Sequence, residues 1–186
     1  VFIFSDFRHG LFSARTIPQL MALVPQGVFR AADSQVANRW GNIVDFQGCD
    51  LITPNEREAR FALGDQDSVI RPLALELYKR ANCQTLMLKL GDRGLITYRA
   101  PNDDVRSFFT MESFAGHVVD AVGAGDALLA YSSLALATTR SPVVASILGS
   151  MAAGVACERE GNQPVSPNDI LKKLDAVEQA IRYEYV

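Results

Sequence analysis

The stretch from Val119 to Asp126 combines a glycine turn with a carboxylate at the start of an apolar helix. Gly123 and Gly125 have no side chains, so the backbone there can approach an anion closely, and the N–H groups at a helix start carry partial positive charge. Asp126 falls in the first helical turn, where its carboxylate could accept a proton from an attacking hydroxyl group. An anion hole beside a base predicts phosphoryl transfer.

Three other interpretations of this turn must be weighed, and the second of them fails. The turn could simply connect a strand to a helix, with Asp126 as a cap. A dinucleotide-binding loop would need a third glycine at Leu128 and an acid about 20 residues further on at a strand end, whereas a continuous helix follows. A D-x-G-x-G loop for S-adenosylmethionine normally opens an α/β domain, and this one comes after two-thirds of the chain. A methyltransferase is therefore a distant alternative.

Asn55 and Glu58 form a second candidate pair at the start of a predicted helix. Residues three apart lie on one helix face, so both side chains should project toward the carboxyl ends of the strands, where open α/β sheets bind ligands. Glu58 could also be a helix-start charge that favours the helix dipole.

The elements that position these residues alternate between strand and helix over the first hundred residues, which favours a parallel α/β sheet. The predicted strands are Val1 to Phe4, Val28 to Ala31, Leu51 to Thr53, Thr85 to Lys89 and Leu95 to Tyr98, with extended segments at Val105 to Phe109 and His117 to Val119. The predicted helices are Ile17 to Leu23, Glu56 to Leu63, Val69 to Ala81, Ala127 to Thr139, Pro142 to Glu158 and Pro167 to Ile181.

Length and composition predict one folded domain over residues 1–186. The chain is 48% hydrophobic and 21% charged, with a net charge of -3 and no dense Lys/Arg cluster, so neither nucleic acid nor a membrane is an expected partner. Three widely spaced cysteines offer neither a disulfide framework nor a metal-ligand pair, which favours the cytoplasm. The apolar opening at Val1 reads as a buried strand and suggests that preceding sequence has been left out.

The stretch from Asp120 to Asp126, D-A-V-G-A-G-D, resembles the D-T-x-G-A-G-D signature of the PfkB (ribokinase-like) carbohydrate kinases. Two further segments agree in order and spacing. Residues 53–58, T-P-N-E-R-E, are similar to the family's P-N-x-x-E element, and residues 89–94, K-L-G-D-R-G, are similar to its T-L-G-x-x-G nucleotide loop. The resemblance implies a ribokinase-like α/β fold with a mainly parallel sheet flanked by helices, of which the N-terminal sugar-binding and lid part is absent.

The resemblance also implies a role for each matching residue. Asp126 would be the catalytic base, with anion-hole N–H groups from Gly123, Ala124 and Gly125. Glu58 would organise magnesium through water, and Asp120 would bind a monovalent cation together with carbonyl groups of Val122, Ala156, Arg159 and Gly161. The ATP-binding residues would be Asn55, Lys89, Gly91, Asp92, Arg93, Gly94 and Ser150.

The acceptor implied is a small sugar or sugar phosphate. Residues 5–11, S-D-F-R-H-G-L, resemble the S-D-Y-x-K-G-x-L element of the heptose-7-phosphate kinase branch, and Asp6 and Asp33 are the candidate substrate residues. The branch's D-P-K-G element is D-S-Q-V here and lacks its lysine, while Ala121 and Val165 remove hydroxyl groups expected near the cation. A non-catalytic nucleotide-binding or interaction domain is the alternative function, and a homo-oligomer is expected because apolar surface would be exposed without the N-terminal part.

Overall fold

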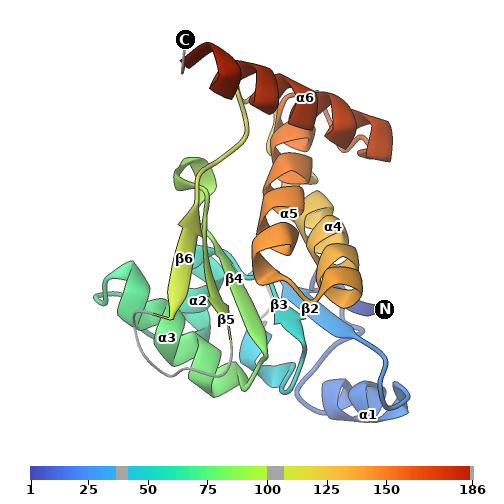
Figure 1. Ribbon diagram of the computed structural model, residues 1–186. Helices are drawn as coiled ribbons and strands as arrows, with labels where there is room; N and C mark the ends of the chain where they lie inside the picture. The colour runs from blue at the N-terminus through green and yellow to red at the C-terminus, as the bar shows by residue number, and fades with distance from the viewer. Residues whose placement is uncertain (37–41, 100–106, 185–186) are drawn as a thin grey trace. The chain divides into compact units, whose positions relative to one another are not determined.

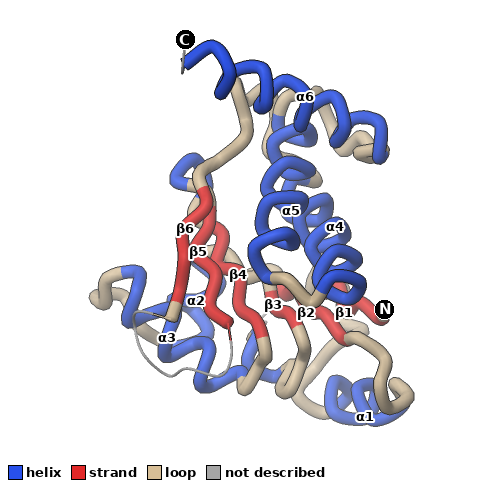
Figure 2. Tube along the Cα trace, viewed as in Figure 1, coloured by secondary structure: helices blue, strands red, loops and turns tan. Residues whose placement is uncertain are grey.

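The computed structural model describes residues 1–36, 42–99 and 107–184. Its contacts divide the chain into two compact units, Val1–Met111 and Glu112–Val186. Figure 1 labels the helices and the strands β2 to β6, and Figure 2 also labels β1. Within the described ranges, no helix has both the length and the apolar character to cross a membrane. The assignment of residues 1–186 to one catalytic domain stays a prediction.

The first unit is built on a six-stranded sheet in the order β1-β2-β3-β4-β5-β6. The first four strands are parallel, whereas β5 and β6 each run antiparallel to the preceding strand. The prediction of a mainly parallel sheet is therefore confirmed, with an antiparallel edge. The strands are β1 (Phe2–Asp6), β2 (Arg30–Ser34), β3 (Leu51–Ile52), β4 (Thr85–Lys89), β5 (Leu95–Arg99) and β6 (Phe108–Met111).

The core of the first unit lies where alternating strand residues meet the apolar faces of helices. Leu86 and Leu88 of β4 belong to one buried cluster with Leu73 and Leu77, as expected from the period of two in a strand and the four-residue spacing in a helix. Figure 2 shows how the helices of this unit connect successive strands. These helices are α1 (Thr16–Leu23), α2 (Glu56–Leu63) and α3 (Ile70–Ala81).

The second unit consists of the helices α4 (Ala124–Thr139), α5 (Pro142–Cys157) and α6 (Pro167–Glu184). A short connection makes α4 and α5 a helical hairpin, and Ser141 caps α5 through a hydrogen bond from the Val144 N–H. Gly149 allows α4 and α5 to approach closely, since a Cβ atom there would lie 2.0 Å from the Ser132 hydroxyl oxygen. Ser166 and Asp169 exchange capping hydrogen bonds at the start of α6, as the sequence predicts.

The strand expected at Val28 to Ala31 is observed as Arg30–Ser34. Two further expectations differ from the structure for local reasons. α4 begins at Ala124 rather than Ala127, because the positive φ of Gly123 starts the helix directly after the turn. The segment His117 to Val119 is not a strand, and the Val119 N–H instead donates to the Cys157 carbonyl at the end of α5. The N-terminal part of the segment expected to be extended at 105–109 lies outside the described residues, and the rest belongs to β6.

Candidate active site

The glycine turn of the second unit lies at the N-terminus of α4, where the sequence places it. Gly123 is the N-cap residue with φ 82°, and its carbonyl accepts the Ala127 N–H at 2.9 Å. The Ala124 N–H donates to the Ala121 carbonyl at 3.2 Å, so this predicted anion-hole donor also closes the turn. Asp126 is half-buried in the first turn of α4. The turn and its carboxylate therefore share one helix terminus, which favours an anion.

Asp120 fastens this turn to the loop that follows α5. One oxygen of the Asp120 carboxylate accepts the Val122 N–H at 3.0 Å, and the other accepts the Gly161 N–H at 3.1 Å. The carbonyls of Ala156 and Gly161 also accept backbone N–H groups. These predicted cation ligands already serve as hydrogen-bond acceptors within the loop. Each of these oxygens has a further lone pair, so a hydrogen bond does not exclude a bound cation. The monovalent-cation site stays a prediction.

In the first unit, polar side chains gather at the carboxyl ends of the parallel strands. Asp6 ends β1, is 2% exposed and pairs with Arg8, with 2.6 Å between Arg8 Nη1 and Asp6 Oδ2. Arg8 has a φ of 63°, in the left-handed region, and its N–H also donates to Asp6. The Ser34 hydroxyl of the neighbouring strand donates to the same carboxylate. Asp6 thus holds together the loop after β1 and the end of β2.

Lys89 at the end of β4 forms an ion pair with Asp33 of β2. The Lys89 Nζ atom lies 3.0 Å from Asp33 Oδ1, which also accepts the Thr53 hydroxyl at 3.0 Å. Sequence reasoning assigned Lys89 to the nucleotide loop and missed this pair. No local signal could reveal it, because the two residues are 56 positions apart and β3 lies between their strands. The Lys89 ammonium group therefore lies beside Asp33, the first residue of the D-S-Q-V segment. This segment lacks the lysine of the D-P-K-G element that it resembles.

Asn55 and Glu58 form a reciprocal capping box at the start of α2. Asn55 Oδ1 accepts the Glu58 N–H at 2.8 Å, while the Asn55 N–H and Nδ2 donate to the two oxygens of Glu58 at 2.7 and 2.8 Å. Burial raises the pKa of Glu58 to about 7; Lys89 opposes this rise, whereas Asp33 adds to it. Because Mg²⁺ keeps several of its waters, Glu58 fits a magnesium site that is contacted through water. In the described ranges, no three His, Cys, Asp or Glu residues form a metal-binding group.

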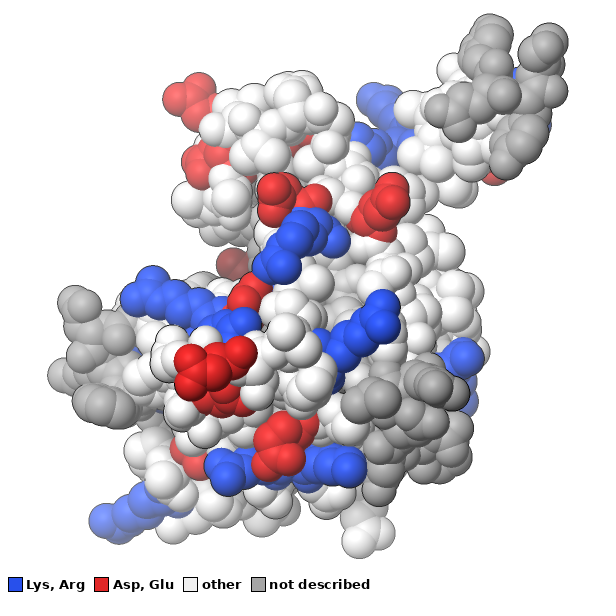
Figure 3. All heavy atoms as spheres, turned by 90° about the vertical axis from the view of Figure 1, so that its left-hand side faces the viewer, with Lys and Arg blue, Asp and Glu red and all other residues white. Residues whose placement is uncertain are grey.

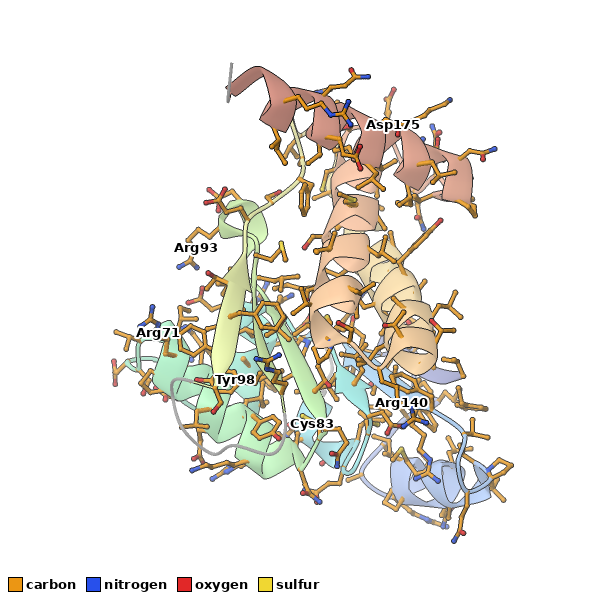
Figure 4. All side chains as sticks on the ribbon, in the orientation of Figure 1. Arg71, Cys83, Arg93, Tyr98, Arg140 and Asp175 are labelled. Atoms are coloured by element: carbon orange, nitrogen blue, oxygen red, sulfur yellow. The ribbon has the colours of Figure 1, made fainter. Side chains whose placement is uncertain are left out.

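The predicted nucleotide loop forms a tight turn between β4 and β5. Gly91 and Gly94 have positive φ values, and the Leu90 N–H donates to the Gly94 carbonyl at 2.8 Å. Arg93 is exposed and pairs with Glu56 at the start of α2. Figure 4 labels Arg93 beside this turn. The exposed Asp92 and Arg93 can reach a ligand, and the glycines give the loop its shape.

Ser150, the remaining predicted ATP-binding residue, lies within α5 and is 5% exposed. It is the least accessible of the residues assigned to the nucleotide.

On the face in Figure 3, Lys and Arg side chains are interspersed with Asp and Glu side chains. The ion pairs that Glu56 makes with Arg60 and Arg93 are examples of such mixed charge.

The chain is similar to known proteins in both sequence and structure. The model for the pfkB family carbohydrate kinases matches residues 16–169. The "Bifunctional protein HldE" of Geobacter metallireducens is 27% identical over 178 residues, which cover 94% of this chain and 35% of that protein. The chain therefore spans about a third of the length of this curated relative.

Two solved ribokinases show the same fold. The Thermotoga maritima enzyme matches with a TM-score of 0.74 and 21% identity over 93% of this chain and 56% of its own. The Arabidopsis thaliana enzyme, complexed with ribose and ATP, matches with a TM-score of 0.74 and 19% identity over 92% of this chain and 55% of its own. Together with the family match, these likenesses show that the chain has a ribokinase-like fold and belongs to the pfkB family of carbohydrate kinases.

Proposed function

We propose that the chain carries the catalytic part of a kinase that transfers the terminal phosphoryl group of ATP to a hydroxyl group of a sugar or sugar phosphate. One observation carries the proposal: Asp126 lies in the first turn of α4, directly after the glycine turn. An anion-attracting helix terminus and a carboxylate are thereby placed together. Phosphoryl transfer needs this combination, because charge must be stabilised on phosphate oxygens while a hydroxyl group loses its proton.

In the proposed reaction, Asp126 accepts the proton of the acceptor hydroxyl group. The hydroxyl oxygen forms a bond to the terminal phosphorus of ATP, the bond from that phosphorus to the bridging oxygen breaks, and ADP leaves with the bonding electrons. The N–H groups of Gly123 and Gly125, with Ala124 between them, face the negative charge of the transferred group. Asp126 thus acts as a base while the turn stabilises the phosphoryl oxygens.

The first unit is assigned to the nucleotide and its metal. Glu58 would hold Mg²⁺ through water, Asn55 would lie near the nucleotide phosphates, and the loop from Lys89 to Gly94 would lie along the ATP. Bound Mg²⁺ neutralises charge on phosphate oxygens. The capping box supports this assignment, because it fixes the Glu58 carboxylate with two hydrogen bonds before any ligand arrives.

The acceptor is assigned as a sugar phosphate, with heptose 7-phosphate as the first candidate. The resemblance of residues 5–11 to the heptose-7-phosphate kinase branch supports this choice. Asp6 and Asp33 are the proposed acceptor residues, and the ion pair of Asp6 with Arg8 places a cation at the strand ends where an anionic substrate could be recognised.

The test is the substitution Asp126→Asn in the full-length protein encoded by the gene. ADP formation is measured with ATP, magnesium and a panel of heptose 7-phosphate, ribose, fructose and their phosphates. Loss of a general base should lower turnover on the order of a hundredfold or more while ATP binding is retained. Asp175→Asn is the matched control, because Asp175 is exposed on α6 (Figure 4). Near-normal turnover of the Asp126 variant would contradict the assigned role, and no turnover of any sugar by the unaltered protein would favour a non-catalytic domain.

A further inference from the structure

Asn162 occupies the space beside Gly123 that any larger residue at position 123 would need. A Cβ atom at Gly123 would lie 2.2 Å from Asn162 Oδ1 and 3.0 Å from Asn162 Cγ. At Gly161, in contrast, a Cβ atom would have no neighbour within 4 Å. The absence of a side chain at Gly123 therefore serves two purposes: it permits a φ of 82°, and it admits the amide of Asn162 against the turn.

The loop that carries Asn162 is held against the turn by hydrogen bonds on both sides. The N–H groups of Val119 and Asp120 donate to the Cys157 carbonyl at 2.8 and 3.2 Å, and the Asp120 carboxylate accepts the Gly161 N–H at 3.1 Å. Asn162 follows Gly161 directly, so its backbone is fixed one residue from this contact. These bonds hold the backbone of the loop beside the turn, and the exposed Asn162 side chain extends from it to Gly123.

Two more contacts restrict the same loop from its other end. Arg159 pairs with Asp169 at 2.6 Å, and its guanidinium donates to the Pro164 carbonyl at 3.2 Å. The Gln163 side-chain amide bonds to the Glu160 carbonyl at 3.0 Å and so stays within the loop. The Asn162 amide therefore lies against the glycine turn, whereas the adjacent Gln163 amide is hydrogen-bonded within the loop.

We propose that Asn162 is a positioning residue of the phosphate site, whose neutral amide closes the side of the glycine turn and keeps its N–H groups aimed at the transferred phosphoryl group. This inference rests on the proposed function and adds to it a residue from outside the glycine turn. A neutral amide suits the place, because it can fill the space beside Gly123 without adding negative charge next to an anion. A carboxylate of nearly the same shape would repel that anion.

The test uses this difference between shape and charge. Asn162→Asp preserves the size of the side chain and adds one negative charge, while Gln163→Glu makes the same chemical change at the next residue. The affinities of the chain for ATP and for ADP, each with magnesium, are measured by calorimetry for the unaltered chain and both variants. ADP lacks the terminal phosphate, so the ratio of the two affinities isolates the group that the turn is proposed to hold.

We expect Asn162→Asp to weaken ATP binding on the order of tenfold more than ADP binding, as one added unit charge close to a phosphate should. Gln163→Glu should leave the ratio within about twofold of the original, because the Gln163 side chain lies against the Glu160 carbonyl within the loop and not against the glycine turn. If Asn162→Asp leaves the ratio unchanged while both nucleotides bind, Asn162 only fills space and the inference is wrong. If the unaltered chain binds neither nucleotide, the proposed function fails and the inference with it.

A second experiment tests the contact between Asn162 and Gly123 without any ligand. The variants Gly123→Ala, Asn162→Ala and the double variant are compared by urea unfolding. Gly123→Ala should be destabilising for two reasons: the positive φ at position 123 and the clash of the new Cβ atom with Asn162. When Asn162→Ala is combined with it, the clash is removed and the strain from the positive φ remains. The double variant should therefore lose less stability than the two single losses together. Additive losses would show that the amide does not occupy this space and would overturn the inference.

Discussion

Glu58 couples the stability of the chain to pH through its buried carboxyl group. Burial raises its pKa from 4.5 to about 7, so between these two values the folded chain keeps a proton that the unfolded chain has released. The free energy of unfolding must then fall as pH rises through this window, and it levels off above pH 7. The shift sets an upper limit of about 3 kcal/mol on the loss.

Urea unfolding followed by circular dichroism from pH 5 to pH 7.5, without magnesium, measures this effect. Glu58→Gln should flatten the decrease in stability, because glutamine does not titrate. Glu56→Gln is the matched control on the same helix. Hydrogen bonding to Arg60 lowers the pKa of Glu56, so protonation of Glu56 changes the free energy of unfolding only at pH values below this window. Equal slopes for the unaltered chain and the Glu58 variant would show that Glu58 is ionised throughout.

The sequence predicts the local contacts of the candidate site but not those between residues far apart in the chain. The capping pair of Asn55 and Glu58 is local, and the shared face expected from its spacing agrees with the hydrogen bonds observed. The ion pair of Lys89 with Asp33 depends on the order of strands in the sheet, which no sequence spacing encodes. The contact of Asn162 with Gly123 likewise depends on where the loop after α5 returns.

At the scale of helices and strands, prediction succeeds where the signal is local. β4 (Thr85–Lys89) and α2 (Glu56–Leu63) have the predicted bounds, because turn residues and a capping box delimit them. β1 extends to Asp6, beyond the apolar run that ends at Phe4, because pairing with β2 continues to Ser34. Pairing with the neighbouring strand thus extends β1 over the polar residues Ser5 and Asp6. Hydrophobic periodicity alone would assign these residues to a loop.

The packing of α4 on α5 offers a test at the element scale. Helix propensity alone predicts that Gly149→Ala should stabilise α5 by about 1 kcal/mol. The structure predicts the opposite, because the added Cβ atom would lie 2.0 Å from the Ser132 hydroxyl oxygen and 3.2 Å from the Leu128 carbonyl oxygen. We expect a net destabilisation of about 1–3 kcal/mol, the range for overpacked cores.

Thermal and urea unfolding of three variants check this prediction. Ser132→Ala removes the hydroxyl that the new methyl group would meet, so the double variant should recover part of the stability lost in Gly149→Ala. The Leu128 carbonyl contact remains, and full recovery is not expected. A Gly149→Ala variant at least as stable as the unaltered chain would show that α4 and α5 are not packed this closely.

At the scale of the whole chain, each compact unit carries one part of the proposed chemistry. The first unit holds the capping box and the predicted nucleotide loop, and the second holds the glycine turn with Asp126. The family match spans both units, since it extends from residue 16 to residue 169. The family and the fold class could be recognised from three ordered motifs. The division into two units falls after Met111, close to the point where the predicted alternation of strands and helices ends.

Isothermal titration calorimetry of the chain with ATP and magnesium tests whether these 186 residues form a nucleotide site, because the assigned nucleotide and phosphate residues all lie within them. We expect saturable binding of both ATP and ADP below millimolar concentration, together with a rise in melting temperature by mass action. S-adenosylmethionine, titrated in parallel, should produce no binding heat. If the folded chain binds S-adenosylmethionine, or shows no heat at millimolar nucleotide, it is not the ATP-binding part of a kinase.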